Sequence, residues 1–401
     1  MTLNTEIENK RKILTMSLEE AFLYLGIITT VLSFSANDTL SRACSFMMYF
    51  FWLGWAVLSF SHTSVRINKA VLYMVFVYAF LWLIMQVLYL QGIHSTSGLG
   101  PARYIILCVP FYFFGNNISF DNGNVIKGIV FSYVFAHIVF TTLAFFLLFW
   151  TGVSNAKNMS GQVLGLGIVL DFSFVPRLIK SRIGRIFIYS WGVFSLITLW
   201  FLHSRTPFIA ALIVIFFFFF ERKRNPIAYF FVILLVIVVI VYFGQTQSGN
   251  EQLQNFLIGN RKYTEVDFSN ADAIFSGRFE IFAEAISDFF SHPLVGVGGW
   301  AYIDNFPLHV LRVGGLTYGI LILPFVYKRL FGCIFGFRKR KCNMKEESNE
   351  FLILLSAKYI SLFFIVVSLM EGYPPLGPGT SAFFLWIVLG MKDAVTEKEQ
   401  I

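Results

Sequence analysis

Arg278 is placed where it can bind a phosphate group. It follows Ser276-Gly277 and precedes apolar residues at helical spacing, so it lies in the first turn of an expected helix. The N–H groups and the dipole at a helix N-terminus favour anions, and arginine adds planar, bidentate recognition of phosphate. The surrounding segment is acidic, so Arg278 either binds an anion or pairs with Glu280 or Asp272.

Three further arginines lie near the ends of apolar runs. Arg205 lies in the turn His203–Pro207, where it either binds an anion or reaches the membrane–water interface. Arg103 lies at the start of another apolar run. Arg312 lies a few residues inside a run, a position that usually faces a water-filled cavity or a partner. All four arginines are therefore candidates for binding an anionic substrate.

Acid–base chemistry has its own candidates in the same part of the chain, namely Asp304, His309, His292 and Glu371. His292 precedes a proline, so it either caps a helix or acts in catalysis. His137 lies within a Phe-rich run, and we interpret it as a packing residue. The cysteines and histidines show no metal-ligand spacing, and no nucleotide-binding or Ser-His-Asp motif is present. We expect neither a metal site nor a cofactor.

Transmembrane helices are the elements expected to position these residues. The hydrophobic fraction is 57% and the charged fraction only 13%, whereas a soluble domain carries roughly 25% charged residues. The mean hydropathy is +0.69. A soluble globular protein is thereby excluded, and the fold class is all-α. The net charge of +8 indicates basic cytoplasmic loops in a membrane protein, and we expect no nucleic-acid partner.

A membrane span needs about 20 apolar residues. The candidate spans are 18–35, 44–61, 70–91, 104–116, 128–151, 161–176, 186–203, 206–220, 226–244, 309–331, 351–370 and 379–391. With the N-terminus in the cytoplasm, basic residues concentrate in the inside loops at nearly every turn. We therefore expect a polytopic integral membrane protein with about twelve transmembrane helices and with both termini in the cytoplasm. The glycines of Gly165-Leu166-Gly167 suit ordinary helix–helix packing.

The spans divide the chain into three parts. Residues 1–244 form a transmembrane bundle of about nine spans, 245–308 a large outer loop, and 309–401 the last spans and a cytoplasmic tail. After Arg278 the loop has apolar residues at helical spacing up to Pro293, which predicts an amphipathic helix on the membrane surface. The apolar positions are Phe279, Phe282, Ala283, Ile286, Phe289 and Phe290.

Several of these segments resemble the O-antigen polymerase and ligase superfamily. The segments are Ser276-Gly277-Arg278, Phe289-Phe290-Ser291-His292-Pro293-Leu294-Val295-Gly296-Val297-Gly298, Asp304-Asn305, Gly315-Leu316-Thr317-Tyr318-Gly319 and Ser204-Arg205. They are similar to that superfamily's large periplasmic loop and to its second arginine motif. The motifs cover about residues 200–320, and the number of spans agrees over most of the chain. The ligase histidine of the superfamily is replaced here by Asp304, which favours the polymerase branch.

The resemblance implies a GT-C-like glycosyltransferase of the bacterial cell inner membrane that acts in lipopolysaccharide biosynthesis. It would join oligosaccharide repeat units, carried on undecaprenyl diphosphate, at the periplasmic face. Its other partners would be membrane lipid, a chain-length regulator and a flippase. The alternatives are a ligase that transfers polymer to lipid A–core and a lipid-linked sugar flippase or transporter. A transporter usually has ionisable groups near the membrane midplane and repeated halves.

The implied reaction assigns roles to the candidate residues. Arg205 and Arg278 would clamp the diphosphate as negative charge grows on it, with Arg312 or Arg103 as helpers. The arginines would then supply the positive charge that a metal ion supplies in other enzymes. Asp304 or His309 would orient or deprotonate the acceptor hydroxyl.

Overall fold

The computed structural model describes residues 17–35, 37–62, 65–94, 102–118, 125–151, 157–221, 278–298, 303–340, 348–377 and 382–398. Within these ranges the chain consists of helices joined by short turns, and no strand is present. The helices are α2 (Leu18–Leu32), α3 (Asp38–His62), α4 (Lys69–Leu90), α5 (Ala102–Asn117), α6 (Val125–Thr151), α7 (Lys157–Ser173), α8 (Val175–Leu178), α9 (Arg182–Phe201), α10 (Arg205–Glu221), α14 (Arg278–Ser291), α15 (Phe306–Arg340), α16 (Asn349–Ser368) and α17 (Ala382–Lys398).

The all-α, polytopic fold expected from composition is confirmed. Seven helices of the described chain are long and apolar enough to cross a membrane. The predicted span 226–244 lies outside the described residues, as does most of the loop 245–308. The total of about twelve spans, the division into three parts and the orientation of the termini stay predictions.

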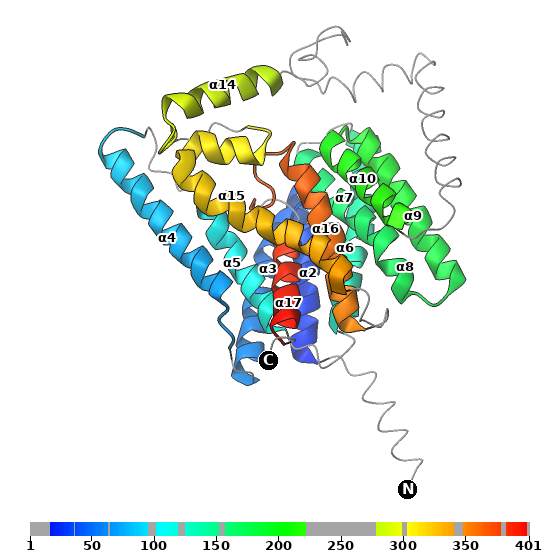
Figure 1. Ribbon diagram of the computed structural model, residues 1–401. Coiled ribbons are helices and arrows are strands. Elements are labelled where there is room, and N and C mark those ends of the chain that lie inside the picture. Colours follow the sequence, from blue (N-terminus) through cyan, green and yellow to red (C-terminus); the bar gives the residue numbers. More distant parts are fainter. Residues whose placement is uncertain are drawn as a thin grey trace, which may run out of the picture.

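One short helix lies across an end of the helix bundle (Figure 1). This helix, α14, covers the region where α15 begins, whereas the first residues of α2 and the last residues of α17 lie at the opposite end. The predicted amphipathic helix is therefore present, and it starts at Arg278. Ser276 and Gly277, which precede this helix, lie outside the described residues.

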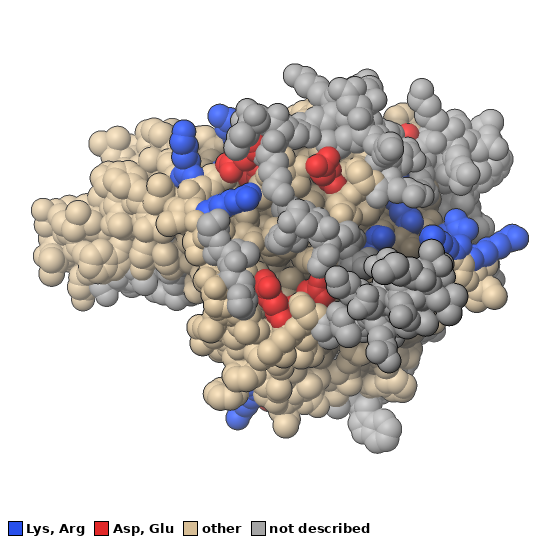
Figure 2. All heavy atoms as spheres, turned by 90° about the horizontal axis from the view of Figure 1, so that it is seen from below, with Lys and Arg blue, Asp and Glu red and all other residues tan. Residues whose placement is uncertain are grey.

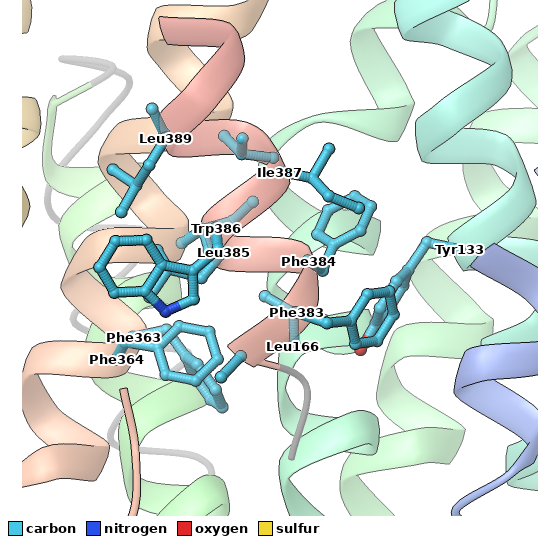
Figure 3. Packing of buried hydrophobic residues seen from close by; sticks show 14 of the residues in the cluster. Tyr133, Leu166, Phe363, Phe364, Phe383, Phe384, Leu385, Trp386, Ile387 and Leu389 are labelled. Carbon is cyan, nitrogen blue, oxygen red and sulfur yellow. The ribbon is translucent and has the colours of Figure 1, made fainter. Parts of the chain in front are cut away.

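The centre of the bundle is formed by α7, α16 and α17. Helices α7–α8 and α16 are the most enclosed of the seven candidate spans, with 89% and 83% of their apolar windows buried. Figure 3 shows Phe383 and Phe384 of α17 beside Tyr133 of α6. The centroids of the Tyr133 and Phe384 rings are 4.6 Å apart. Burial of these large apolar side chains holds the central helices together.

Helices α3 and α4 expose large apolar side chains to the outside of the bundle. Phe46 is 79% exposed on α3, and Leu72 and Phe76 on α4 are 59% and 65% exposed. In the view of Figure 2, the part of the molecule that projects to the left carries no charged side chain. Such a surface is unfavourable in water but suits contact with lipid.

The C-terminal helix is fastened to its neighbours through Asp393. The Asp393 carboxylate forms an ion pair with Arg329 of α15, accepts a hydrogen bond from the Tyr112 hydroxyl of α5 at 2.7 Å, and pairs with Lys392 at 2.7 Å. The Arg329 guanidinium also lies 4.7 Å from the centroid of the Phe325 ring and 5.3 Å from that of Tyr112. We call Asp393, Arg329, Lys392 and Tyr112 the Asp393 cluster.

Candidate functional site

The turn between α9 and α10 presents Arg205, and α7 supports this turn from below. Gly161 and Gly165 of α7 face Ser204 and Pro207, so the turn packs directly on the α7 backbone. A Cβ atom added to Gly161 would lie 1.8 Å from the Ser204 Oγ, and one added to Gly165 would lie 3.0 Å from a Pro207 carbon. Gly165 thus has the packing role expected from the sequence. This close packing fixes the position of Arg205, the first residue of α10.

The end of α14 and the beginning of α15 are joined by backbone hydrogen bonds. Four amides donate across the junction: Val297 N to Arg312 O at 2.9 Å, Gly298 N to Val313 O at 3.0 Å, Leu316 N to Pro293 O at 2.8 Å, and Thr317 N to Leu294 O at 3.1 Å. The segment after His292 and the glycine-bearing segment at 315–319, which the sequence shows as separate motifs, therefore form one structural unit. We call it the motif interlock.

Gly315 makes this unit possible because it bends α15. Its φ of 59° lies in the left-handed region, and a Cβ atom there would be 2.6 Å from the backbone of Leu294. The bend separates residues 306–314 from 316–340, and the first part runs across the bundle beneath α14 (Figure 1). His309 and Arg312 belong to the first part. Arg312 lies three residues before the bend, within the candidate span Phe306–Phe337.

Arg278, at the start of α14, is paired with Asp304. Its Nε donates to Asp304 Oδ2 at 2.9 Å, and the two side chains are only 15% and 18% exposed. Asn305 fixes the position of Asp304, because its side chain donates to Leu369 O at 3.0 Å and accepts from Leu308 N at 2.9 Å. The sequence left two alternatives for Arg278, anion binding or pairing with Glu280 or Asp272, and the described carboxylate that pairs with it is Asp304.

Arg312 is held by two carboxylates of α14. Its Nη2 lies 2.7 Å from Glu284 Oε1 and 2.7 Å from Asp288 Oδ2, and the residue is 8% exposed. The position of Arg312 in the sequence indicates a partner or a cavity for this charge but does not by itself identify Glu284 and Asp288. Their spacing of four residues places them on the same side of the helix, which was a signal available in the sequence. Arg312 thereby ties α14 to α15.

Arg205 completes a compact group of charges. It precedes the apolar stretch of α10, and burial together with the neighbouring Arg278 lowers the pKa of Arg205 to about 10. The carboxylates of Asp304 and Glu371 act in the opposite direction and favour its charged form. Arg205 therefore stays protonated at neutral pH. We call Arg205, Arg278, Asp304 and Glu371 the arginine centre.

Glu371 and His309 come from the elements that enclose this centre. Glu371 follows α16 and is 3% exposed, although it carries an ionisable side chain. His309 is 4% exposed and packs edge-on against Tyr373 of the same loop, with 5.7 Å between the ring centroids. Glu371 is one of the acid–base candidates of the sequence. It is far from Arg205 in the sequence, but in the structure it lies close enough to act on the charge of Arg205.

Two candidates are not brought to the centre by the described contacts. His292 is exposed at the end of α14, where its backbone N–H donates to Asp288 O at 3.1 Å, so it ends the helix. Arg103 lies in the first turn of α5, but its side chain is outside the described residues.

The arginine centre combines charges suited to an anionic substrate with groups that accept protons. Its two guanidinium groups can bind a phosphate or diphosphate, and its two carboxylates can orient or deprotonate a hydroxyl. Among the residues that the structure describes, no group of three or more His, Cys, Asp or Glu side chains is arranged to hold a metal ion.

Comparison with known proteins identifies the same region. Residues 191–320 match the model of the O-antigen ligase family, and this stretch includes Arg205, α14, the motif interlock and Asp304. No curated protein matches the sequence. The family indicates an enzyme that acts on lipid-linked sugars and does not distinguish polymerases from ligases. The match supports membership of this chain in the O-antigen polymerase and ligase superfamily.

Proposed function

We propose that this protein is an O-antigen polymerase of the inner membrane, which joins oligosaccharide repeat units carried on undecaprenyl diphosphate at the periplasmic face. The observation that carries this proposal is the arginine centre. Two arginines from α10 and α14 meet there with two carboxylates, at the end of the bundle that α14 covers. A lipid-linked diphosphate needs such fixed positive charge when it leaves, because negative charge then grows on its oxygens.

The reaction proceeds in one displacement. The acceptor hydroxyl oxygen forms a bond to the anomeric carbon of the donor, and the bond from that carbon to the diphosphate oxygen breaks. The electron pair of the broken bond goes to the diphosphate, which Arg205 and Arg278 stabilise. The hydroxyl proton goes to a basic side chain, for which the Asp304 carboxylate is our first candidate and the His309 imidazole the second.

The Arg278–Asp304 pair links binding to proton transfer. In the structure Asp304 Oδ2 lies 2.9 Å from Arg278 Nε. A diphosphate carries more charge than a carboxylate and offers more oxygens, so it replaces Asp304 as the partner of Arg278. Asp304 is then released as a base close to the reacting atoms. The acceptor hydroxyl is activated only when the donor is bound.

The other predicted arginines have supporting roles in this proposal. Arg312, paired with Glu284 and Asp288, keeps α14 over the arginine centre and so acts on the position of Arg278. Arg103 stays a proposed helper of diphosphate binding, and the charge of the arginines makes a metal ion unnecessary for this step.

The test is the lipopolysaccharide ladder of a strain that lacks the gene, complemented with wild type, Arg205→Ala or Arg278→Ala. A polymerase defect leaves core plus one repeat unit, and we expect this single band in the deletion strain and in both variants. Protein levels in the membrane are measured in parallel. A full ladder in both variants would show that the arginine centre is not the reaction site.

The same gel separates the alternatives. Bare core in the deletion strain would identify the ligase, which the family match favours equally. Accumulation of the lipid-linked repeat unit on the cytoplasmic side would identify a flippase. The described residues give the flippase one supporting observation, a buried ionisable pair between α6 and α7, which has a different explanation below.

A further inference from the structure

A second pair of ionisable side chains lies deep between α6 and α7. His137 Nδ1 and Asp171 Oδ2 are 3.5 Å apart, and both side chains are 0% exposed. Neither ring nitrogen of His137 and neither carboxylate oxygen of Asp171 has a hydrogen-bond partner in the described part of the chain. Burial of such groups among apolar helices is costly, and ionisable residues within membrane spans usually have a function. The proposed glycosyl transfer at the arginine centre does not use this pair directly.

The packing around the pair is shaped to hold the imidazole. The His137 ring lies against the α7 backbone at Gly167, where an added Cβ atom would be 2.3 Å from the ring. One turn along α6, Thr141 Oγ1 and Ser195 Oγ of α9 are 3.2 Å apart, and both are fully buried. Gly167 therefore leaves the space that the His137 ring fills between α6 and α7.

The described charged side chains around this pair belong to the neighbouring helices. The helices packed against α6 and α7 are α2, α8, α9, α10 and α16. The titratable groups on these helices and on α6 itself are Glu19, Glu20, Tyr24, Lys127, Tyr133, Arg177, Arg182, Arg185, Tyr189, Arg205, Glu221, Glu350, Lys358 and Tyr359. None of these groups forms an ion pair or a hydrogen bond with His137 or Asp171.

Helix α7 connects the pair to the arginine centre. Asp171 and Gly167 lie on the same helix as Gly161 and Gly165, on which the turn that carries Arg205 is packed. A displacement of α7 at Asp171 would therefore act on the packing of Gly161 and Gly165 against Ser204 and Pro207.

We propose that His137 and Asp171 form a proton-binding site within the membrane, which holds one exchangeable proton between His137 Nδ1 and Asp171 Oδ2 and thereby keeps α7 in the position that supports Arg205. The proton comes from bulk water and returns to it. When it is lost, a bare carboxylate remains in an apolar environment, so the packing of α7 becomes unfavourable and water or movement must compensate. The two residues are positioning residues, and the effect on activity rests on the proposed function.

The first experiment measures proton binding alone and does not depend on the proposed function. The full-length protein, purified with ¹³C-labelled aspartate, is examined by pH-difference infrared spectroscopy. We expect a protonated-carboxyl band that shifts with the label, disappears at alkaline pH and is missing from Asp171→Asn. The absence of any band that depends on Asp171 between neutral and alkaline pH would overturn the proposal.

The second experiment measures glycosyl transfer against pH in vesicles for wild type, Asp171→Asn and His137→Gln. We expect wild type to lose activity in a step on the alkaline side. Asp171→Asn is always neutral and keeps the amide near the imidazole, so the step is absent there, and His137→Gln moves it to another pH. An unchanged profile in both variants, at unchanged thermal stability, would show a purely structural pair and overturn the coupling. If the wild type has no transferase activity at all, the proposed function fails, and the infrared result still decides the proton site.

Discussion

Arginines at the two ends of the bundle are held in different ways. In the Asp393 cluster, Arg329 pairs with a carboxylate of α17 and lies over the aromatic rings of Tyr112 and Phe325. In the arginine centre, Arg278 pairs with Asp304 among the described residues and lies beside the like charge of Arg205. The Asp393 cluster therefore stabilises the fold. The arginine centre holds two cations side by side, and an added anion would stabilise them.

The largest expected effect is on activity at the arginine centre. In the proposed reaction, Arg205→Ala and Arg278→Ala would each remove a charge that acts on the leaving diphosphate, and we expect the transfer rate to fall by about 10²–10³-fold. The rate is measured per amount of folded protein with a purified lipid-linked donor. A loss of less than about 10-fold in both variants would mean that these arginines do not contact the diphosphate.

The matched variant at the other end is Arg329→Ala, and its effect falls on stability. It leaves the buried Asp393 without its strongest partner, and we expect a loss of about 2–3 kcal/mol in the free energy of unfolding. The transfer rate per folded molecule should stay within about 3-fold of wild type, a difference of less than 1 kcal/mol in barrier. A large rate loss in Arg329→Ala at unchanged stability would remove the contrast between the two ends.

The sequence predicted the helices well because their cause is local. Long apolar runs and capping residues such as Ser17, Asn68 and Ser348 mark where helices begin, and the expected and observed starts differ by only a few residues for α2, α4 and α16. The sequence also indicated Arg205, Arg278 and Asp304. Their types and places at helix ends follow from chemistry that single residues carry.

Pairings across long stretches of sequence were not predictable from the chain. The contact of Arg278 with Asp304, and of Arg312 with Glu284 and Asp288, depends on the bend at Gly315, which no hydrophobic pattern reveals. The pairing of His137 with Asp171 depends on how α6 rotates against α7. Such contacts are decided by packing, so they become visible only when the helices are placed together.

The bend at Gly315 gives a sharper test of how the arginine centre is positioned. Gly315→Ala puts a Cβ atom at a φ of 59° and 2.6 Å from the Leu294 backbone, so we expect a loss of about 1–3 kcal/mol and a lower transfer rate. Gly332→Ala in the same helix is the control, since its Cβ atom meets nothing within 4 Å, and it should be neutral or slightly stabilising. Thermal unfolding of the two variants side by side checks this prediction, and equal stability would contradict it.

A smaller effect is expected from Arg312→Gln. The variant loses both ion pairs to α14, which are partly exposed and therefore contribute only about 1 kcal/mol together. We expect faster hydrogen exchange of the α14 amides and a modest loss of transfer activity, while the α16 amides keep their protection. Unchanged exchange in α14 would show that the motif interlock alone holds this helix.

The motif interlock makes residues 293–298 and 312–317 depend on each other, whereas the side chains around them can vary. Its hydrogen bonds run between backbone atoms, so they constrain chain geometry and leave most side chains unspecified. A segment from residue 278 to residue 317 would therefore transfer between related enzymes as one cassette, whereas either half moved alone would lose its partner. In the proposed reaction, sugar preference can then change through substitutions around this unit, while the two arginines that stabilise the diphosphate, Arg205 and Arg278, stay the same.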